Sequence, residues 1–383
     1  MSIFEWKNVS LTLHRRERHT TVTRRLLLNI DGYVKSGQLL GIQGPSGCGK
    51  TSLINALTGR VAFSKNVKLE GDIRYNNHDV DVEDFDKRIV CISQTDMLFS
   101  YLTVRDTLLL SAAFHQSWDT PRRMIEEKVE STIRELGLLK VSDTIIGSNS
   151  RRGVSGGEYK RVLIGKEMMK DPDIVFVDEP TSGLDAFQAL AVMEAMKEVT
   201  NKGKMVIAVV HQPRSSIFSL FDNLLLLTEG KSVYFGSAKN VLLYLDELGY
   251  SVPEHYNPAD FYLDLMSVDF RSLDREIESR IRIDHLTSQW LYNRGRFAMQ
   301  EEQRRHSLGS PLTDGSRANR REDYPIHLDR PLLSTSDIAT VEVNGPSIAR
   351  PNEVSVPRAM LTAHKTCLAW VRHTFHPSIH CPQ

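Results

Sequence analysis

Unbroken apolar runs of four to six residues recur along the chain and are separated by polar turns and amphipathic segments. Four of these runs are Leu39–Ile42, Ile89–Ile92, Ile174–Val177 and Met205–Val210. Continuous apolar strands are typical of parallel sheets covered on both faces, and segments with helical spacing, such as residues 186–200, supply the covering helices. The pattern therefore predicts an α/β fold built around a parallel sheet.

The first 35 residues show a different pattern. Apolar and polar positions alternate there in two runs, Phe4–Leu13 and Leu26–Val34. A basic, polar stretch separates the two runs and is expected to form a loop. Alternation of this kind predicts an antiparallel β subdomain at the N-terminus, packed near the parallel sheet.

A helical block interrupts the strands over about residues 98–170. Thr103 with Asp106, and Thr120 with Pro121, have the residue types that begin helices, and apolar positions recur at helical spacing after each pair. We therefore expect an α-helical subdomain inserted between strands.

Composition narrows the possible functions. The 383 residues contain 48 Lys plus Arg and 48 Asp plus Glu, so the zero net charge gives no support to a nucleic-acid groove or a polybasic membrane surface. The four cysteines lack metal-ligand spacing and fit a reducing cytosolic setting. Residues 286–358 are expected to form a disordered linker, because from about residue 295 onward the chain is rich in Arg, Ser, Pro, Asp and Asn. No run approaches the roughly 20 apolar residues of a spanning helix, so we expect that the chain does not cross a membrane by itself.

The most specific motif follows the run that ends at Ile42. Residues 44–51, Gly-Pro-Ser-Gly-Cys-Gly-Lys-Thr, fit the phosphate-loop pattern G-x-x-x-x-G-K-[ST] between a predicted strand and a predicted helix. The glycines let consecutive N–H groups point at phosphate oxygens, Lys50 would reach the β- and γ-phosphates, and Thr51 would bind Mg²⁺. A glycine-rich turn without a ligand is the alternative, but every fixed position is present, so we expect a bound nucleoside triphosphate. The predicted contacts are Gly44, Pro45, Ser46, Gly47, Cys48, Gly49, Lys50, Thr51 and Ser52.

Polar side chains follow three of the other apolar runs: Gln94, Asp178 with Glu179, and His211. Ligands of open α/β sheets bind beyond the carboxyl ends of the strands, so we expect these side chains beside the phosphate loop. Asp178 and Gln94 would join Thr51 around Mg²⁺. Glu179 points the other way along the strand and would orient or deprotonate the attacking water. His211 would contact the γ-phosphate, the alternative being a hydrogen-bonded core histidine. The predicted catalytic residues are thus Glu179, His211 and Gln94, and the predicted metal ligands are Thr51, Gln94 and Asp178.

A second anion site is predicted in residues 154–161, Val-Ser-Gly-Gly-Glu-Tyr-Lys-Arg. Ser155 and Glu158 fit a capping box that opens a helix, and Gly156 and Gly157 expose N–H groups in its first turn. A well-capped helix with no ligand is the alternative. One triphosphate seldom needs two such sites from one chain, which suggests sites shared within a dimer.

These motifs, in this order, resemble those of the ATP-binding cassette (ABC) family. Residues 154–158 resemble its signature, residues 174–180 its Walker-B strand, residues 182–185 its D-loop, and His211 its switch histidine. The resemblance covers residues 1–285 and implies a RecA-like P-loop NTPase core with an N-terminal antiparallel β subdomain and an inserted α-helical subdomain. It also implies ATP and Mg²⁺ as cofactors. Two cassettes would pair head to tail, so that the signature residues Ser155, Gly156, Gly157 and Glu158, with Asp185, contact nucleotide across the dimer.

Within that family the chain resembles the G subfamily of half-transporters, of the White and sterolin type, through residues 152–158, 211–218 and 257–262. The resemblance implies ATP hydrolysis that powers export of lipid or sterol-like molecules at the cytoplasmic side of the plasma membrane. It implies a second half-transporter or cassette as partner, identical or different, and no nucleic acid. Residues 359–383 resemble the start of the amphipathic helix that leads into the membrane domain, which predicts a truncated chain that is cytosolic when alone.

Two other functions remain open at this point. A truncated cassette could pair with a full-length partner and regulate it without transporting. A soluble cassette ATPase of DNA repair or translation is disfavoured, because neither a long coiled-coil insertion nor a second cassette is present. The family usually stacks adenine on an aromatic residue after the first strand, whereas Thr12, Leu13 and His14 occupy that region here.

Overall fold

The structure, a computed structural model, describes residues 2–17, 20–61, 66–80, 87–93, 96–117, 119–148, 151–253 and 256–307. Nearly all of them belong to one unit, Met1–Gln303, and the second unit, Arg304–Gln383, is described only over residues 304–307. The predicted connecting segment at residues 359–383 therefore lies outside the described residues, as does most of the predicted linker.

A six-stranded sheet with the order β10-β9-β3-β8-β7-β6 forms the centre of the first unit. Its strands are β3 (Leu39–Gln43), β6 (Ile89–Ile92), β7 (Ile174–Asp178), β8 (Met205–Val209), β9 (Asn223–Thr228) and β10 (Lys231–Ser237). Neighbouring strands are parallel except for β9 and β10. The parallel strands are buried along their length apart from the last residue of β7, as their unbroken apolar runs predict.

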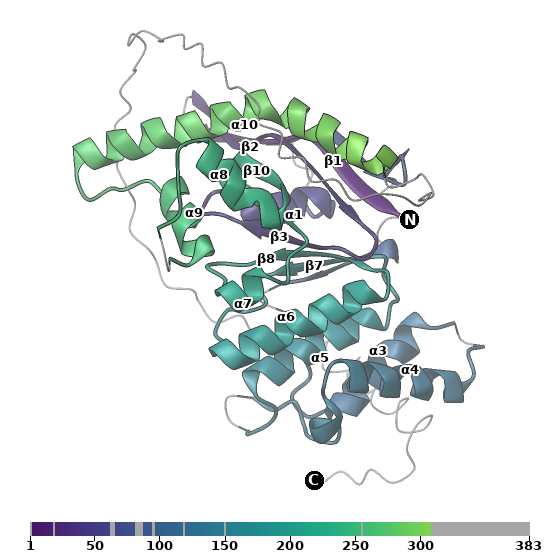
Figure 1. Ribbon diagram of the computed structural model, residues 1–383. Coiled ribbons are helices and arrows are strands. Elements are labelled where there is room, and N and C mark those ends of the chain that lie inside the picture. Colours follow the sequence, from purple (N-terminus) through teal and green to yellow (C-terminus); the bar gives the residue numbers. More distant parts are fainter. Residues whose placement is uncertain are drawn as a thin grey trace, which may run out of the picture. The chain divides into compact units, whose positions relative to one another are not determined.

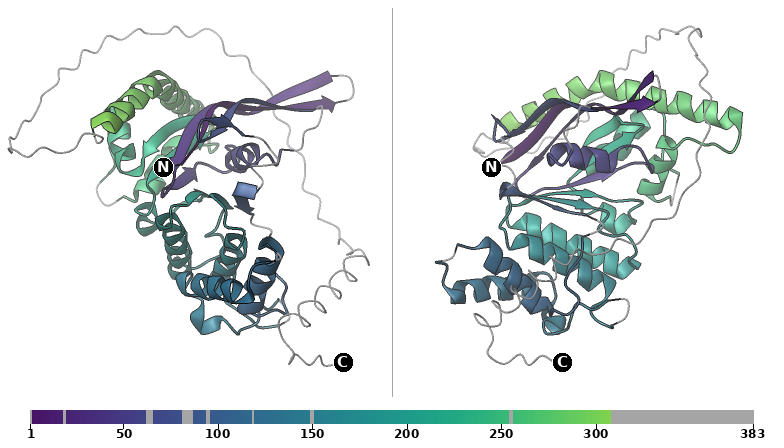
Figure 2. Two further views of the ribbon diagram at one scale, coloured as in Figure 1. Left: turned by 90° about the vertical axis from the view of Figure 1, so that its right-hand side faces the viewer. Right: turned by 180° about the vertical axis from the view of Figure 1, so that it is seen from behind.

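Alternate residues of these strands feed two separate cores, one on each face of the sheet. Leu40, Ile42 and Phe176 pack on the face that is covered by the helix α1 (Lys50–Leu57) and the N-terminal sheet. Val175 and Val177 pack on the other face, against the helical part of the chain. Figure 2 shows α1 between the two sheets.

The N-terminal sheet is antiparallel, as predicted, with the order β2-β1-β4-β5. Its strands are β1 (Ile3–Glu17), β2 (Thr20–Lys35), β4 (Val67–Tyr75) and β5 (His78–Asp79). The expected basic loop between the first two strands is wrong, because β1 and β2 stay paired as far as Glu17 and Thr20. Residues 20–23 are Thr-Thr-Val-Thr, and β-branched residues favour extended backbone even in a polar stretch. This hairpin extends past the rest of the sheet (Figure 2).

The helices α3 (Val104–His115), α4 (Arg122–Glu135) and α5 (Gly156–Met168) fall within residues 98–170 and gather at one end of the unit (Figure 1). A short 3-10 helix, Leu139–Val141, lies between α4 and α5, and α6 (Ala186–Asn201) packs between α5 and the sheet. The Thr103 hydroxyl accepts a hydrogen bond from Asp106 N, so the predicted cap of α3 is confirmed. The predicted cap at Thr120 is wrong: α4 begins at Arg122, with Pro121 at the cap position and no side-chain bond.

The remaining elements follow β8 and β10. They are α7 (Ser215–Phe218), a 3-10 helix (Ala238–Asn240), α8 (Val241–Glu247), α9 (Pro258–Met266) and α10 (Leu273–Ser307). The linker predicted from residue 286 is wrong over residues 286–307, which continue α10. Leu286 and Trp290 are buried there, and the Trp290 ring lies 5.6 Å from that of Tyr234. Within the described residues, no helix combines the length and the apolar character needed to cross a membrane.

We expect Thr103→Ala to lower the free energy of unfolding by about 1 kcal/mol, because it removes the cap of α3. Thr120→Ala is the matched control and should change it by less than about 0.5 kcal/mol, since Thr120 caps no helix. Urea denaturation of the two variants measures the difference. Equal losses would contradict the assignment of the two helix starts.

Candidate nucleotide-binding site

The predicted site residues meet because four parallel strands end at one edge of the sheet. Ile42 of β3 and Asp178 of β7 both pair with Val209 of β8, and Ile92 of β6 pairs with Val177. The chain leaving each strand therefore emerges beside its neighbours, at the edge where ligands of open α/β sheets bind.

The phosphate loop joins β3 to α1 and requires glycine at both of its ends. Gly44 has φ 156°, and a Cβ there would lie 2.1 Å from the carbonyl oxygen of Leu227. Gly49 has φ 108° and caps α1, and its Cβ would lie 2.9 Å from Leu27 Cδ2. No other residue fits such close approaches with a left-handed backbone, so the loop is held tightly against β2 and β9.

Lys50 bridges the loop from inside. Its Nζ donates to the carbonyl oxygens of Gly44 and Pro45, each at 2.8 Å, and its side chain is buried. Cys48 is also buried, and burial raises the pKa of its thiol against the opposing charge of Lys50. The thiol is therefore neutral at physiological pH and acts as a packing group.

Thr51 and Asp178 form the part of the site suited to a metal ion. The Thr51 hydroxyl donates to Asp178 Oδ2 at 3.1 Å, and Asp178 Oδ1 is buried without a hydrogen-bond partner. Burial raises the pKa of Asp178, opposed by the bond from Thr51. A buried carboxylate oxygen with a vacant acceptor position beside a hydroxyl fits Mg²⁺. Over the described ranges, no group of three or more His, Cys, Asp or Glu could hold a metal alone, so nucleotide and water oxygens would complete the shell.

Glu179 leaves the sheet directly after Asp178. Its N–H still donates to the carbonyl oxygen of Val209 at 3.0 Å, but its φ of 50° turns the chain into the left-handed region. The negative charge of Glu179 acts on Lys160 of α5. Burial lowers the pKa of Lys160, and the charges of Asp96 and Glu179 oppose this shift. Glu179 thus lies beyond the end of β7, and its left-handed turn rather than strand alternation sets its direction, while its charge adds to the raised pKa of Asp178.

His211 lies beside the phosphate loop rather than in a core. Its side chain is exposed, and Nε2 is 3.3 Å from Ser46 Oγ. The following residue, Gln212, also has a left-handed backbone, with φ 45°. The alternative of a core histidine is therefore wrong.

The predicted signature residues begin α5. Ser155 and Glu158 make both bonds of the capping box, and Gly157 N donates to Gln188 Oε1 at 3.1 Å. Asp185 caps α6 by accepting from Gln188 N at 2.9 Å. The starts of α5 and α6 are thus joined through Gln188. In the part of the chain that the structure describes, the side-chain hydrogen bonds of these residues join them to one another and not to the phosphate loop.

Gln94 lies outside the described residues, so its predicted place beside the metal stays a prediction. The neighbouring Ser93 is bonded through its N–H and its hydroxyl to Asp96. The Tyr159 hydroxyl accepts from Leu98 N at 3.0 Å, which ties this loop to α5.

Sequence reasoning missed three residues that support the site: Gln43, Tyr159 and Gln188. Gln43 had a recognisable signal, since it is a polar residue at the end of an otherwise apolar strand next to Gly44. Tyr159 and Gln188 have no signal of this kind, because their hydrogen-bond partners, Leu98 and Gly157, lie 61 and 31 residues away in the sequence.

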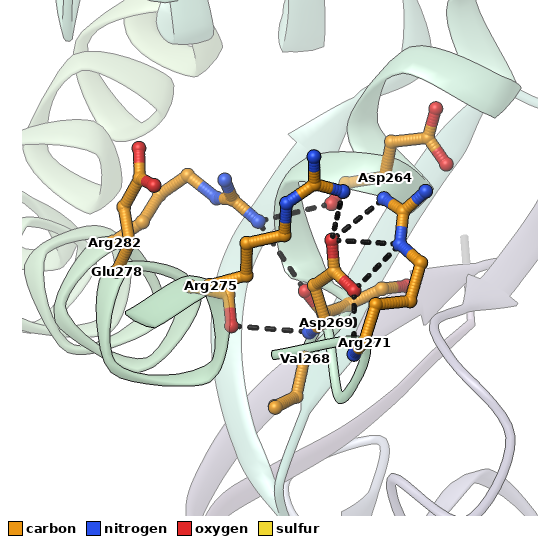
Figure 3. A pocket seen from close by; sticks show the side chains of 9 residues that line it. Asp264, Val268, Asp269, Arg271, Arg275, Glu278 and Arg282 are labelled. Carbon is orange, nitrogen blue, oxygen red and sulfur yellow. Dashed lines mark hydrogen bonds and ion pairs between the residues drawn. The ribbon is translucent and has the colours of Figure 1, made fainter. Parts of the chain in front are cut away.

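A pocket of about 520 Å³ lies between α9 and α10, and none of the predicted site residues lines it (Figure 3). Its lining residues are Asp264, Ser267, Val268, Asp269, Arg271, Arg275, Glu278, Ser279 and Arg282. The charges bind one another: Arg271 donates to both oxygens of Asp269, and this holds the pKa of Asp269 below its usual range. Positive and negative side chains thus balance one another in the lining of this pocket, which lies at the junction between the two helices.

The chain matches two families of known proteins. Residues 27–182 match the family described as ABC transporter, and residues 211–324 match the family described as ABC-2 type transporter. The first match contains Lys50, Thr51, Asp178 and Glu179, and the second begins at His211. The chain is also similar in fold to an ATP-binding cassette of an ABC transporter solved in its ADP conformation, with a TM-score of 0.50, 24% identity, and coverage of 65% of this chain and 98% of that chain. The predicted fold class is thus confirmed.

Three curated relatives illustrate the similarity in sequence. ABC transporter G family member 7 of Arabidopsis thaliana is 39% identical over 282 residues, which is 73% of this chain and 38% of that protein. ATP-binding cassette sub-family G member 5 of Homo sapiens is 38% identical over 266 residues, 70% of this chain and 40% of that protein. Protein white of Drosophila melanogaster is 37% identical over 298 residues, 77% of this chain and 43% of that protein. The matched part of the chain thus spans about two-fifths of the length of these relatives.

We expect Lys50→Ala to weaken Mg-ATP binding by roughly 10- to 100-fold, because hydrogen bonds to charged groups contribute about 1.5–3 kcal/mol. Fluorescent-nucleotide titration of the purified chain measures the loss, and circular dichroism checks the fold. Lys68→Ala is the matched control, since Lys68 is exposed and pairs with Glu70 on β4. Equal affinity of the Lys50 variant and the wild type would place the nucleotide elsewhere.

Proposed function

Because this chain belongs to the ABC transporter family, in its G subfamily, and contains the family's ATP-hydrolysing cassette, we propose that it binds Mg-ATP at the edge formed by β3, β8, β7 and β6. The principal support is the contact of Thr51 with Asp178, next to a lysine held inside the phosphate loop. This contact joins the two motifs that the sequence separates by 127 residues.

The proposed roles in binding follow from the contacts. Lys50 would exchange its bonds to the Gly44 and Pro45 carbonyls for bonds to β- and γ-phosphate oxygens. The N–H groups of residues 46–52 would cradle the phosphates at the start of α1. Thr51 and Asp178 would hold Mg²⁺, which neutralises charge that develops on the phosphates. Gln94 is proposed as the third group at this ion.

Hydrolysis is assigned to the residues that leave the sheet beside Asp178. Glu179 would orient or deprotonate the attacking water, because it follows the metal ligand but turns away from it. His211 would contact the γ-phosphate, since its ring reaches Ser46 of the phosphate loop. Neither residue is buried in a core, so both can meet a ligand.

We propose further that a complete site needs two cassettes arranged head to tail. Ser155 and Gly156 are exposed, and α5 begins at Gly156, so the positive end of this helix faces outward, while Gly157 N and Glu158 N already donate within the chain. Their bonds join them to α6 and not to the phosphate loop of the same chain. The nucleotide site would therefore be completed on its γ-phosphate side by a second cassette, through the partner's Ser155, Gly156, Gly157, Glu158 and Asp185. The partner would be a second G-subfamily cassette, identical or different.

At the level of the whole protein, we propose that hydrolysis powers export of lipid or sterol-like molecules. Two of the relatives named above carry subfamily G in their names, and this chain matches only about two-fifths of the length of each. The cassette would act on the cytoplasmic side of a membrane, joined to a membrane domain that selects the substrate.

We expect Glu179→Gln to keep Mg-ATP binding but to lower turnover by about 10²–10⁴-fold, because the substitution removes the base and leaves Asp178 in place. Phosphate release under saturating ATP measures turnover, and nucleotide titration measures binding. Glu194→Gln on the exposed face of α6 is the matched control and should keep full turnover. Wild-type turnover in the Glu179 variant would show that another group activates the water.

A mixing experiment tests the shared site. Lys50→Ala breaks every phosphate loop of its homodimer, and Ser155→Arg breaks every signature. A mixed dimer has one intact site and one doubly broken site, so activity should recover only on mixing. Specific activity of the purified wild-type chain should also rise with protein concentration, because two separate chains must meet to complete each site. Activity linear in concentration, without recovery on mixing, would mean that one chain builds the whole site.

A further inference from the structure

The helix α9 reaches the strand that enters the phosphate loop. Tyr262 is fully buried, and its hydroxyl donates to Oε1 of Gln43, which is also fully buried. Gln43 is the last residue of β3 and directly precedes Gly44. Its Nε2 is buried without a hydrogen-bond partner, so the Tyr262 hydroxyl is the group that fixes this amide. A contact between residues 219 positions apart in the sequence thus fixes the position of the Gln43 side chain, the last one before the phosphate loop.

The same helix also reaches the loop that follows His211. Asn257 caps α9, and its amide donates to the Pro213 carbonyl oxygen and accepts from the Ser215 hydroxyl at 3.2 Å. The rings of Tyr262 and Phe218 lie 6.2 Å apart, which packs α9 against α7. The helix α9 therefore contacts two segments beside the proposed γ-phosphate position. One is the end of β3 before the phosphate loop, and the other is the loop that follows His211.

The far end of α9 is fixed by α10 (Figure 3). Arg282 donates to the carbonyl oxygens of Asp264, Leu265 and Ser267 at the C-terminus of α9, where carbonyl groups lack partners from a following helical turn. Arg280 donates to Glu229 at 3.1 Å, and Gly230 N in turn donates to the carbonyl oxygen of Cys48. The two helices thus hold the phosphate loop at its beginning and near its end.

We propose that Tyr262 is a positioning residue for ATP binding: its bond to Gln43 fixes the direction in which the chain enters Gly44. This inference rests on the proposed function, since its effect is on bound nucleotide. Tyr262 lies behind the loop and would not touch ATP itself. A loop whose N–H groups must converge on phosphate oxygens loses affinity when its entry strand can move, because the fixed geometry no longer precedes binding.

The test compares nucleotide affinity with folding stability in four variants of the full chain. Tyr262→Phe and Gln43→Leu each leave a buried polar group without its partner, so each should lower stability and weaken Mg-ATP binding, the latter by about tenfold. The double variant replaces both partners with apolar groups, so its stability should recover in part, whereas its ATP affinity should stay as low as that of the single variants. Tyr234→Phe is the matched control: its buried hydroxyl donates to the Ser237 carbonyl on β10, so it should lose stability without losing affinity.

The outcomes are distinct. Wild-type affinity in Tyr262→Phe would overturn the inference, and so would an equal loss in Tyr234→Phe or an affinity that recovers with stability in the double variant. Each of these results would leave the proposed function standing. Absence of Mg-ATP binding in the wild-type chain would contradict the proposed function and this inference with it. If Tyr262→Phe does not fold, Gln43→Leu alone gives the comparison, because it removes the same bond from the other side.

Discussion

The register of β3, β8 and β7 is the constraint on which the whole site depends. Val209 pairs with both Ile42 and Asp178, so the phosphate loop and the Asp178 carboxylate start from the same level of the sheet. A slip of one residue would turn every side chain to the opposite face. Such a slip is costly here, because the alternate residues of these strands fill two different cores. Packing on both faces of the sheet therefore fixes the strand register, and with it the positions of the site residues at the edge of the sheet.

Three turns at this edge use left-handed backbone: Gly44 at φ 156°, Glu179 at φ 50° and Gln212 at φ 45°. Glycine adopts this region without penalty, whereas the other two residues each cost about 1–2 kcal/mol. They persist because neighbouring groups determine their positions, as when Glu179 N bonds to Val209 O. The strained turns aim consecutive side chains in different directions. The separate roles proposed for Asp178 and Glu179 depend on that separation.

The local features of the site could be predicted from the sequence, because a phosphate loop and the polar ends of apolar strands are encoded within a few residues. The long-range features could not. The sequence past Leu13 predicted a basic loop, whereas β1 and β2 continue to pair there. The sequence past residue 286 predicted a polar linker, whereas α10 continues and buries Leu286 and Trp290. Helix starts also needed tertiary context, since Thr103 caps a helix and Thr120 does not. No local pattern pairs Gln43 with Tyr262.

The two family matches divide the nucleotide site between them. Lys50, Thr51, Asp178 and Glu179 belong to the first segment, whereas His211 and the helices α9 and α10 belong to the second. The two segments touch through Ser46 and His211 at the front of the loop and through Gln43 and Tyr262 behind it. The two segments are therefore joined by direct side-chain contacts, and α9 of the second segment reaches the last residue of β3 in the first. Contacts this direct need no chain of intermediate residues between the two segments.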